Sequence, residues 1–243
     1  MEKQEVSNAL KTLREKSPKK KFIQSVDLVI NLQNLDLKKP EHKVDLYLQT
    51  PHSIGKKRKI CAIVDAQLSI QAKKFFDTVI LKEEFPRWKD NKKAQRDLAN
   101  THDFFVSQVE LMGQGAAIFG KVLGARGKMP SPKAGCVVPG SIQNLEPLVN
   151  KLQNTVRLQT KNELTVKASV GIESMKDEDL VNNILAVYNT LLAKLPQEKN
   201  NIRYTAIKLT MGPMIKILEP IKKEKWTNIN LILQITRKKK LLD

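Results

Sequence analysis

Hydrophobic and polar residues alternate in three short segments of the chain. They are VDLVINL at residues 26–32, KVDLYLQ at 43–49 and NELTVKASVG at 162–171. Because successive side chains of a β-strand point to opposite faces of a sheet, each segment predicts a strand with one buried and one wet face. We expect the first two in one antiparallel sheet. The segment IRYTAIKLTM at 202–211 predicts a further strand.

Two other segments repeat their apolar residues at the spacing of an α-helix. Residues 3–16 form one amphipathic face, and residues 177–196 form the clearest helical stripe, with acids at the start and Pro196 after the end. Neither end of the chain holds enough strand to bury a core alone. We therefore expect both ends to fold together as one α+β domain.

The middle of the chain has a different pattern. KICAIV at 59–64 is a continuous apolar run, typical of a strand buried on both faces. Helical stretches and short strands then alternate up to a last helix expected from Ser141 to about Gln153. This alternation predicts βαβ units and a mainly parallel sheet.

The pattern as a whole predicts an α/β (α+β) protein of two domains. Residues 1–57 and 160–220 form a discontinuous α+β domain, and residues 58–159 form an inserted α/β domain. Residues 221–243 are a basic C-terminal extension, in which NINLILQI predicts an edge strand and TRKKK at 236–240 a phosphate-seeking tail.

The net charge indicates the class of partner. With 43 basic and 25 acidic residues the chain carries +18. Such a charge favours polyanions through the release of their counterions, so nucleic acid is the first expectation and an anionic membrane the second. No apolar stretch is long enough to span a bilayer and no secretory signal is recognisable, so we expect a cytoplasmic protein without a membrane partner.

Signs of catalysis, metal binding and cofactor binding are weak. Cys61 and Cys136 stand alone, which argues against a zinc site or a disulfide. Gly115, Gly120 and Lys121 match the spacing of a phosphate-binding loop, but Val122 replaces the hydroxyl residue that binds magnesium. We therefore expect no enzyme, no cofactor and no metal. A nucleotide-dependent enzyme built on the inserted domain remains the alternative.

Three segments carry candidate nucleic-acid contacts. Lys19 to Lys21 run directly into Phe22, which is either a platform for base stacking or the first core residue of its strand. Thr210, Met211 and Gly212 end a strand, where glycine permits close approach of a backbone and threonine offers a hydroxyl. LGARGKMPSPKAG at 123–135 combines glycines, prolines and cations, which predicts an irregular loop.

These segments resemble the large-subunit ribosomal protein one family in its archaeal form. LGARGKMPSPKAG, KLTMGP and KKFIQSVDLVINLQNLDLKKPE carry the resemblance, which runs from about residue 3 to 218. It implies a discontinuous split β-α-β domain and an inserted Rossmann-like three-layer domain. Ala125 and Ser169 stand where the family commonly has proline, and Tyr204 where it often has serine.

The resemblance also implies a function. The family binds rRNA of the lateral stalk near the site where deacylated tRNA leaves, and many members repress translation by binding their own mRNA. The resemblance implies that the main RNA contacts lie in the discontinuous domain and carry over to Phe22, Thr210, Met211 and Gly212, with Lys167 facing the same way. We add Lys21 from the lysine run before Phe22, and we expect Arg126, Lys128 and Lys133 of the loop to face RNA or the domain cleft. We expect a ribosome-associated protein without catalytic activity; a non-ribosomal RNA chaperone is a further alternative.

Overall fold

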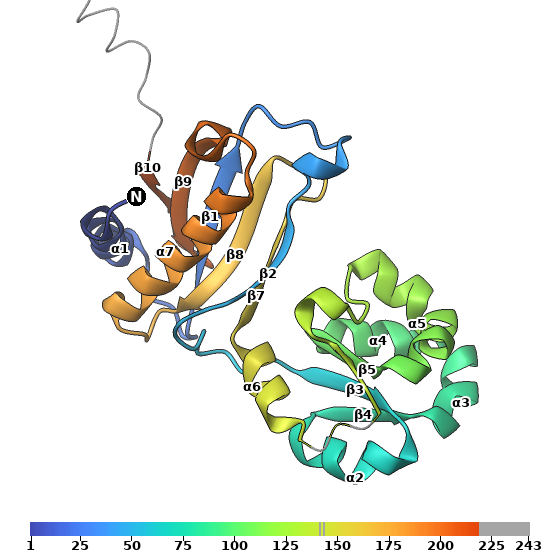
Figure 1. Cartoon of the computed structure of the whole chain (residues 1–243). Helices are drawn as coiled ribbons and strands as arrows, with labels where there is room; N and C mark the ends of the chain where they lie inside the picture. Colours follow the sequence, from blue (N-terminus) through green and yellow to red (C-terminus); the bar gives the residue numbers. More distant parts are fainter. Residues whose placement is uncertain (141, 143, 219–243) are drawn as a thin grey trace, which may run out of the picture.

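The computed structural model describes residues 1–140, 142 and 144–218. Figure 1 shows two bodies of structure, one built from both ends of the chain and one from its middle. The expected edge strand and basic tail in residues 221–243 lie outside the described residues. No helix in the described part is long and apolar enough to cross a membrane.

The first body, which we call the N/C unit, contains a four-stranded antiparallel sheet in the order β10-β9-β1-β8. Helices α1 and α7 lie on one face of this sheet (Figure 1). The bounds of these elements are α1 Lys3–Lys16, β1 Ser25–Leu32, β8 Thr165–Ile172, α7 Asp177–Lys194, β9 Ile202–Leu209 and β10 Met214–Leu218.

The order of the strands confirms the expected split β-α-β arrangement. Helix α7 connects β8 to β9, and β1 lies between these two strands and runs antiparallel to both. Alternate residues of β1, such as Leu28 and Ile30, are buried in one core with the apolar residues of α1 and α7. Amphipathic helices and half-buried strands therefore close this core together, as the alternation predicts.

The prediction that residues 43–49 join the same sheet as β1 is wrong. Strand β2 (Asp45–Gln49) pairs instead with β7 (Thr155–Gln159) in a separate two-stranded ribbon. Strand β7 was not predicted. Its Val156 and Leu158 are buried in the core of the N/C unit. We therefore propose to move the second domain boundary from residue 159 to about 154.

The second body, the insert, occupies residues 58–153 and holds a parallel sheet in the order β4-β3-β5-β6. Its elements are β3 Ile60–Val64, α2 Ala66–Phe75, β4 Thr78–Leu81, α3 Phe85–Asp90, α4 Lys92–Thr101, β5 Phe104–Gln108, α5 Met112–Arg126, β6 Val137–Val138 and α6 Glu146–Gln153. Short 3₁₀ turns occur in both bodies at Pro40–His42, Lys82–Glu84, Val109–Leu111, Pro132–Ala134 and Glu198–Asn201.

Strand β3 explains why the insert has three layers. All five of its residues are buried, as its continuous apolar run predicts. Ile60, Ala62 and Val64 face one core with apolar residues of α2 and α6, whereas Cys61 and Ile63 face a second core with residues of α3, α4 and α5. A sheet with helices on both faces confirms the Rossmann-like α/β class.

Helix α5 differs from the sequence prediction at its C-terminal end. The expected loop 123–135 begins later, because α5 continues to Arg126. Leu123 follows Gly115 and Phe119 on the buried side of the helix, and this packing extends the helix through Gly124. Gly127 ends α5 with φ +67°, a left-handed conformation that favours glycine. Gly115 to Lys121 are thus helical residues and form no phosphate-binding loop.

Candidate RNA interface

Phe22, Ile23 and Met211 expose apolar side chains at one end of the N/C unit sheet. Their exposed fractions are 51%, 65% and 59%. The alternative that Phe22 is a core residue is therefore wrong. We call Phe22, Ile23 and the turn Thr210–Gly212 the strand-end site. Exposed rings and thioethers beside a run of lysines provide a surface on which unstacked bases can lie.

Hydrogen bonds fix the two segments of the strand-end site to each other. The backbone N–H of Ser25 donates to Thr210 Oγ1 at 3.1 Å, and the N–H of Thr210 donates to the carbonyl of Ser25 at 3.2 Å. Gln24 is fully buried and accepts from the N–H of Met211 at 3.1 Å. The side chains of Phe22 and Met211 therefore project from a backbone that these hydrogen bonds hold in place. Because Gln24 is buried, water does not compete for its bond.

Gly212 is tightly surrounded on its protein side. A Cβ atom placed on it would lie 2.6 Å from Ser17 Oγ and 3.1 Å from Leu209 Cβ. Ser17 ends α1, and its hydroxyl is buried without a hydrogen-bond partner among the described residues. Any larger residue at 212 therefore disturbs the end of α1 as well as the outer surface.

Among residues 1–140, 142 and 144–218, no helix lies on the face of the N/C unit sheet opposite α1 and α7 (Figure 1), and we call this the open face. Lys167 of β8 lies opposite Val29 of β1, while Lys208 of β9 lies opposite Asp27. Opposed residues share a face, so both lysines project from the open face on either side of β1. Burial is the main cause that raises the pKa of the Asp27 carboxyl. Lys167 also forms an exposed pair with Glu163 at 3.2 Å.

The three cations expected in the loop of the insert have different surroundings. Lys128 Nζ donates to the carbonyls of Ala99 at 2.9 Å and His102 at 2.7 Å, at the end of α4. Burial lowers the pKa of this lysine. Arg126 Nε donates to Asn100 Oδ1 at 3.1 Å, and Lys133 is exposed. The geometry gives Lys128 a structural contact and leaves Lys133 to solvent.

The two passages of the chain between the bodies lie side by side. The N–H of Thr50 donates to the carbonyl of Asn154 at 2.9 Å. Arg58 N–H donates to Gln153 Oε1 at 2.8 Å, and Gln153 Nε2 donates back to the Arg58 carbonyl at 2.9 Å. Paired crossings of this kind can act as a hinge.

Arg157 of β7 joins the two bodies. Its guanidinium donates to both carboxylate oxygens of Asp45, at 2.8 and 3.0 Å, and to the carbonyl of Gly127 in the insert. It also lies over the ring of Tyr47, 5.2 Å from the centroid. Its hydrogen bonds to the Asp45 carboxylate are the largest cause that raises the pKa of Arg157. Arg157 is therefore fully charged and links the β2–β7 ribbon to the insert.

Sequence reasoning missed Gln24 and Arg157 as residues of this interface, whereas Lys208 was noted beside the strand end at Thr210. Arg157 belongs to TVRLQ, where Val156 and Leu158 alternate with polar residues, and this alternation is a signal for a strand. Nothing in the sequence distinguishes Gln24 from an exposed polar residue. Its role depends on contacts with residue 211, far along the chain.

Comparison with known proteins agrees with the family that the motifs suggest. The model of the ribosomal protein L1p/L10e family matches residues 13–213. The large ribosomal subunit protein uL1 of Methanothermobacter thermautotrophicus is 39% identical over 216 residues, covering 88% of this chain and 99% of the relative. The protein of the same name from Thermococcus kodakarensis is 38% identical, covering 89% of this chain and 98% of the relative.

A third relative with this name, from Nanoarchaeum equitans, is 39% identical over 203 residues, covering 82% of this chain and 93% of the relative. The family and these relatives are named as ribosomal proteins, which supports the non-catalytic prediction over the nucleotide-dependent enzyme. The match extends over most of the described chain, including the strand-end site and both bodies. The chain therefore belongs to the ribosomal protein L1p/L10e family.

Proposed function

We propose that this chain is a structural constituent of the large ribosomal subunit that binds lateral-stalk rRNA through the strand-end site and the open face. The observation that carries the proposal is the exposed cluster of Phe22, Ile23 and Met211, held rigidly by Gln24 beside basic residues. Its family and its relatives' names support the ribosomal assignment. Its place of action is the cytoplasmic ribosome.

Recognition at such a surface depends on the shape of a folded RNA. Apolar side chains stack on splayed bases, and the lysines of the open face neutralise phosphates. Thr210 and Gly212 offer backbone and hydroxyl groups to ribose or phosphate. In this proposal Lys21, which precedes Phe22, and Lys167 of the open face bind phosphate. The same surface serves deacylated tRNA near the exit site and a segment of the chain's own mRNA that mimics the stalk.

The proposal is tested by binding of the purified chain to a stalk rRNA fragment and to an unrelated hairpin of equal length. Phe22→Ala removes the stacking ring, and loss of one base–aromatic stack costs about 1–3 kcal/mol. We expect the affinity for the stalk fragment to fall by roughly fivefold to 150-fold. The matched control is Ile70→Ala, which truncates an apolar side chain that is 72% exposed on α2 of the insert.

Equal affinity of the wild type for both RNAs, or of Phe22→Ala and Ile70→Ala for the stalk fragment, would contradict the proposal. The leader of the chain's own mRNA and a deacylated tRNA are measured with the same variants, and a shared loss would support one common surface. Titration with ATP and GTP tests the enzyme alternative, because the ribosomal proposal expects no saturable nucleotide site.

A further inference from the structure

A cleft of about 230 Å³ lies between the insert and the β2–β7 ribbon. Among the described residues, its lining includes one carboxylate, Asp103, and five cationic side chains drawn from both bodies. The five are Arg58, Arg126, Lys128, Arg157 and Lys161. Cations that converge on a concave surface attract anions more strongly than the same charges spread over a convex one.

Arg58 is a partly buried cation of this cleft. Its guanidinium lies over the ring of Phe104, 5.4 Å from the centroid. Within residues 1–140, 142 and 144–218, no hydrogen-bond acceptor or ion-pair partner lies in contact with this guanidinium. Burial lowers its pKa, and Asp103 offsets only part of this effect. A partly desolvated cation gains free energy when an anion enters beside it.

Apart from Asp103, the groups near the cleft that would repel an anion already accept hydrogen bonds. The carbonyls at the end of α4 accept from Lys128, and the carbonyl of Gly127 accepts from Arg157. Asp45 is held in its bidentate pair with Arg157. Carbonyls are neutral, so the charge of Lys128 is not cancelled by its two acceptors. The free positive charge of the cleft therefore comes from Arg58, Arg126, Lys128 and Lys161, opposed by Asp103.

The cleft continues into a groove of about 490 Å³ along the β7–β8 connection. Arg157, Gln159 and Lys161 line both spaces, and the groove ends at Lys167 of the open face. A chain of phosphates can follow this path from the open face into the cleft. A nucleotide fits this path less well, since pockets for small ligands are lined mainly by apolar and aromatic side chains, whereas polar and charged side chains line the groove.

We propose that the cleft between the two bodies is a second RNA site, where Arg58 and Lys161 each bind one backbone phosphate of the RNA held at the strand-end site. This inference rests on the proposed function and adds a contact to it. The cleft supplies affinity that is independent of base sequence. It also ties the insert to the N/C unit when RNA is bound, because the two cations belong to different bodies.

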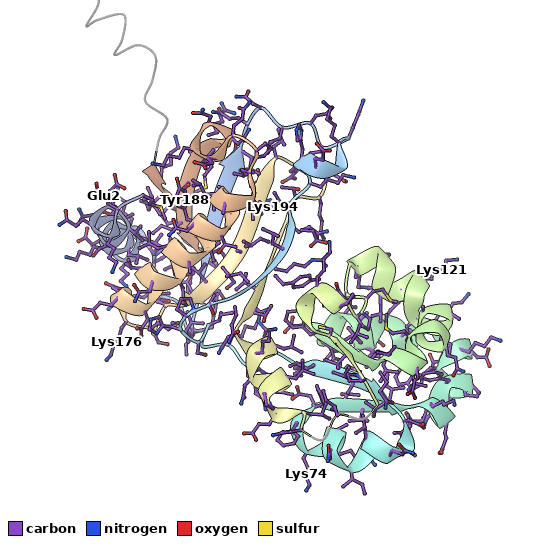
Figure 2. All side chains as sticks on the ribbon, viewed as in Figure 1. Glu2, Lys74, Lys121, Lys176, Tyr188 and Lys194 are labelled. Carbon is purple, nitrogen blue, oxygen red and sulfur yellow. The ribbon has the colours of Figure 1, made fainter. Side chains whose placement is uncertain are left out.

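The test compares two variants that each remove two positive charges from the full chain. Arg58→Gln with Lys161→Gln empties the cleft of its two ligands for phosphate. The control is Lys74→Gln with Lys121→Gln, whose side chains point outward from the insert, away from the N/C unit (Figure 2). Affinity for the stalk fragment is measured over a range of salt concentrations, and folding is checked by thermal unfolding.

We expect the cleft variant to bind at least tenfold more weakly than the control at moderate salt. The slope of log affinity against log salt should fall by about 1.4–1.8, since each lost phosphate contact contributes roughly 0.7–0.9. The preference for the stalk fragment over the hairpin should remain. If the cleft variant does not fold, Lys161→Gln alone is compared with Lys121→Gln alone, and a slope change of about 0.7–0.9 is expected.

Equal affinities and slopes of the cleft and control variants overturn the inference while leaving the proposed function intact. Saturable binding of ATP that disappears in Arg58→Gln also overturns it, in favour of a free nucleotide as the ligand. Loss of preference for the stalk fragment in the wild type, by contrast, contradicts the proposed function itself. The three results are thus distinguishable.

Discussion

Replacing Arg157 by alanine removes the contacts that link the β2–β7 ribbon to the insert. The variant loses two charge-assisted hydrogen bonds to Asp45, the contact with the Gly127 carbonyl and the stacking on Tyr47. The side chains of Arg157 and Asp45 are 25% and 40% exposed, so water partly screens their ion pair.

The expected cost follows from these contacts. A hydrogen bond to a charged group contributes about 1.5–3 kcal/mol when buried, and we take the lower end because of the exposure. A cation–π contact at a half-exposed site adds about 0.5–1 kcal/mol. Arg157→Ala should therefore lower the free energy of unfolding by about 2–3 kcal/mol. For a chain of this size that corresponds to a fall in Tm of about 5–10 °C.

A double-mutant cycle isolates the ion pair. Arg157→Met, Asp45→Asn and their combination are unfolded by heat and by urea, and we expect a coupling of about 1 kcal/mol between the two positions. Arg96→Ala is the control, since it removes an exposed arginine of α4 and should change stability by less than about 0.5 kcal/mol. A coupling free energy near zero, or equal Tm values for Arg157→Ala and Arg96→Ala, would show that the contacts of Arg157 do not stabilise the fold.

Three further predictions concern the interface and the division of the chain. Gly212→Ala should lower the Tm because the new Cβ atom would meet Ser17 Oγ, and adding Ser17→Ala should restore the Tm. If the folded double variant still binds RNA weakly, the RNA backbone approaches residue 212 closely, whereas wild-type affinity would contradict such an approach. Asp27→Asn should raise the Tm at pH 7, because a carboxyl with a raised pKa destabilises the fold above that pKa; the gain should shrink as the pH falls through it, and a gain that grows at acidic pH would refute the reasoning. Replacing residues 58–153 by a short Gly/Ser linker should leave a folded N/C unit that still prefers the stalk fragment, as circular dichroism and binding would show; a folded unit without preference would place specificity in the insert.

The spacing of apolar residues predicted those helices and strands whose own sequence shows which side chains are buried. The alternation of β1, the stripe of α7 and the continuous run of β3 were each confirmed, because core and solvent faces differ clearly along these segments. Strands β6, β7 and β10 were missed. The first has only two residues, and the second lies on a ribbon whose partner, β2, is over a hundred residues earlier.

The composition of residues 123–135 misled the sequence analysis for a physical reason. Glycine weakens an isolated helix, so Gly124 argued for a loop. In the folded chain Leu123 is buried on the inner side of α5, and this packing outweighs the low helix propensity of Gly124. The same limit applies to Phe22. The neighbouring lysines do not show whether the Phe22 side chain is buried or exposed. Gln24 is the buried residue of this segment, and its burial depends on its contact with Met211.

The two parts of the interface differ in what they can distinguish. At the strand-end site, hydrogen bonds from Met211 to Gln24 and from Ser25 to Thr210 hold the backbone, so we expect that a wrongly shaped RNA would fit only if these bonds broke. In the proposed cleft site, we expect Arg58 and Lys161, which come from different bodies, to act on charge alone. A fixed surface selects by shape, whereas flexible cations accept any phosphate within reach. Substitutions at the strand-end site should therefore change the preference between RNAs with little effect on the salt slope. Substitutions in the cleft should change the slope and leave the preference.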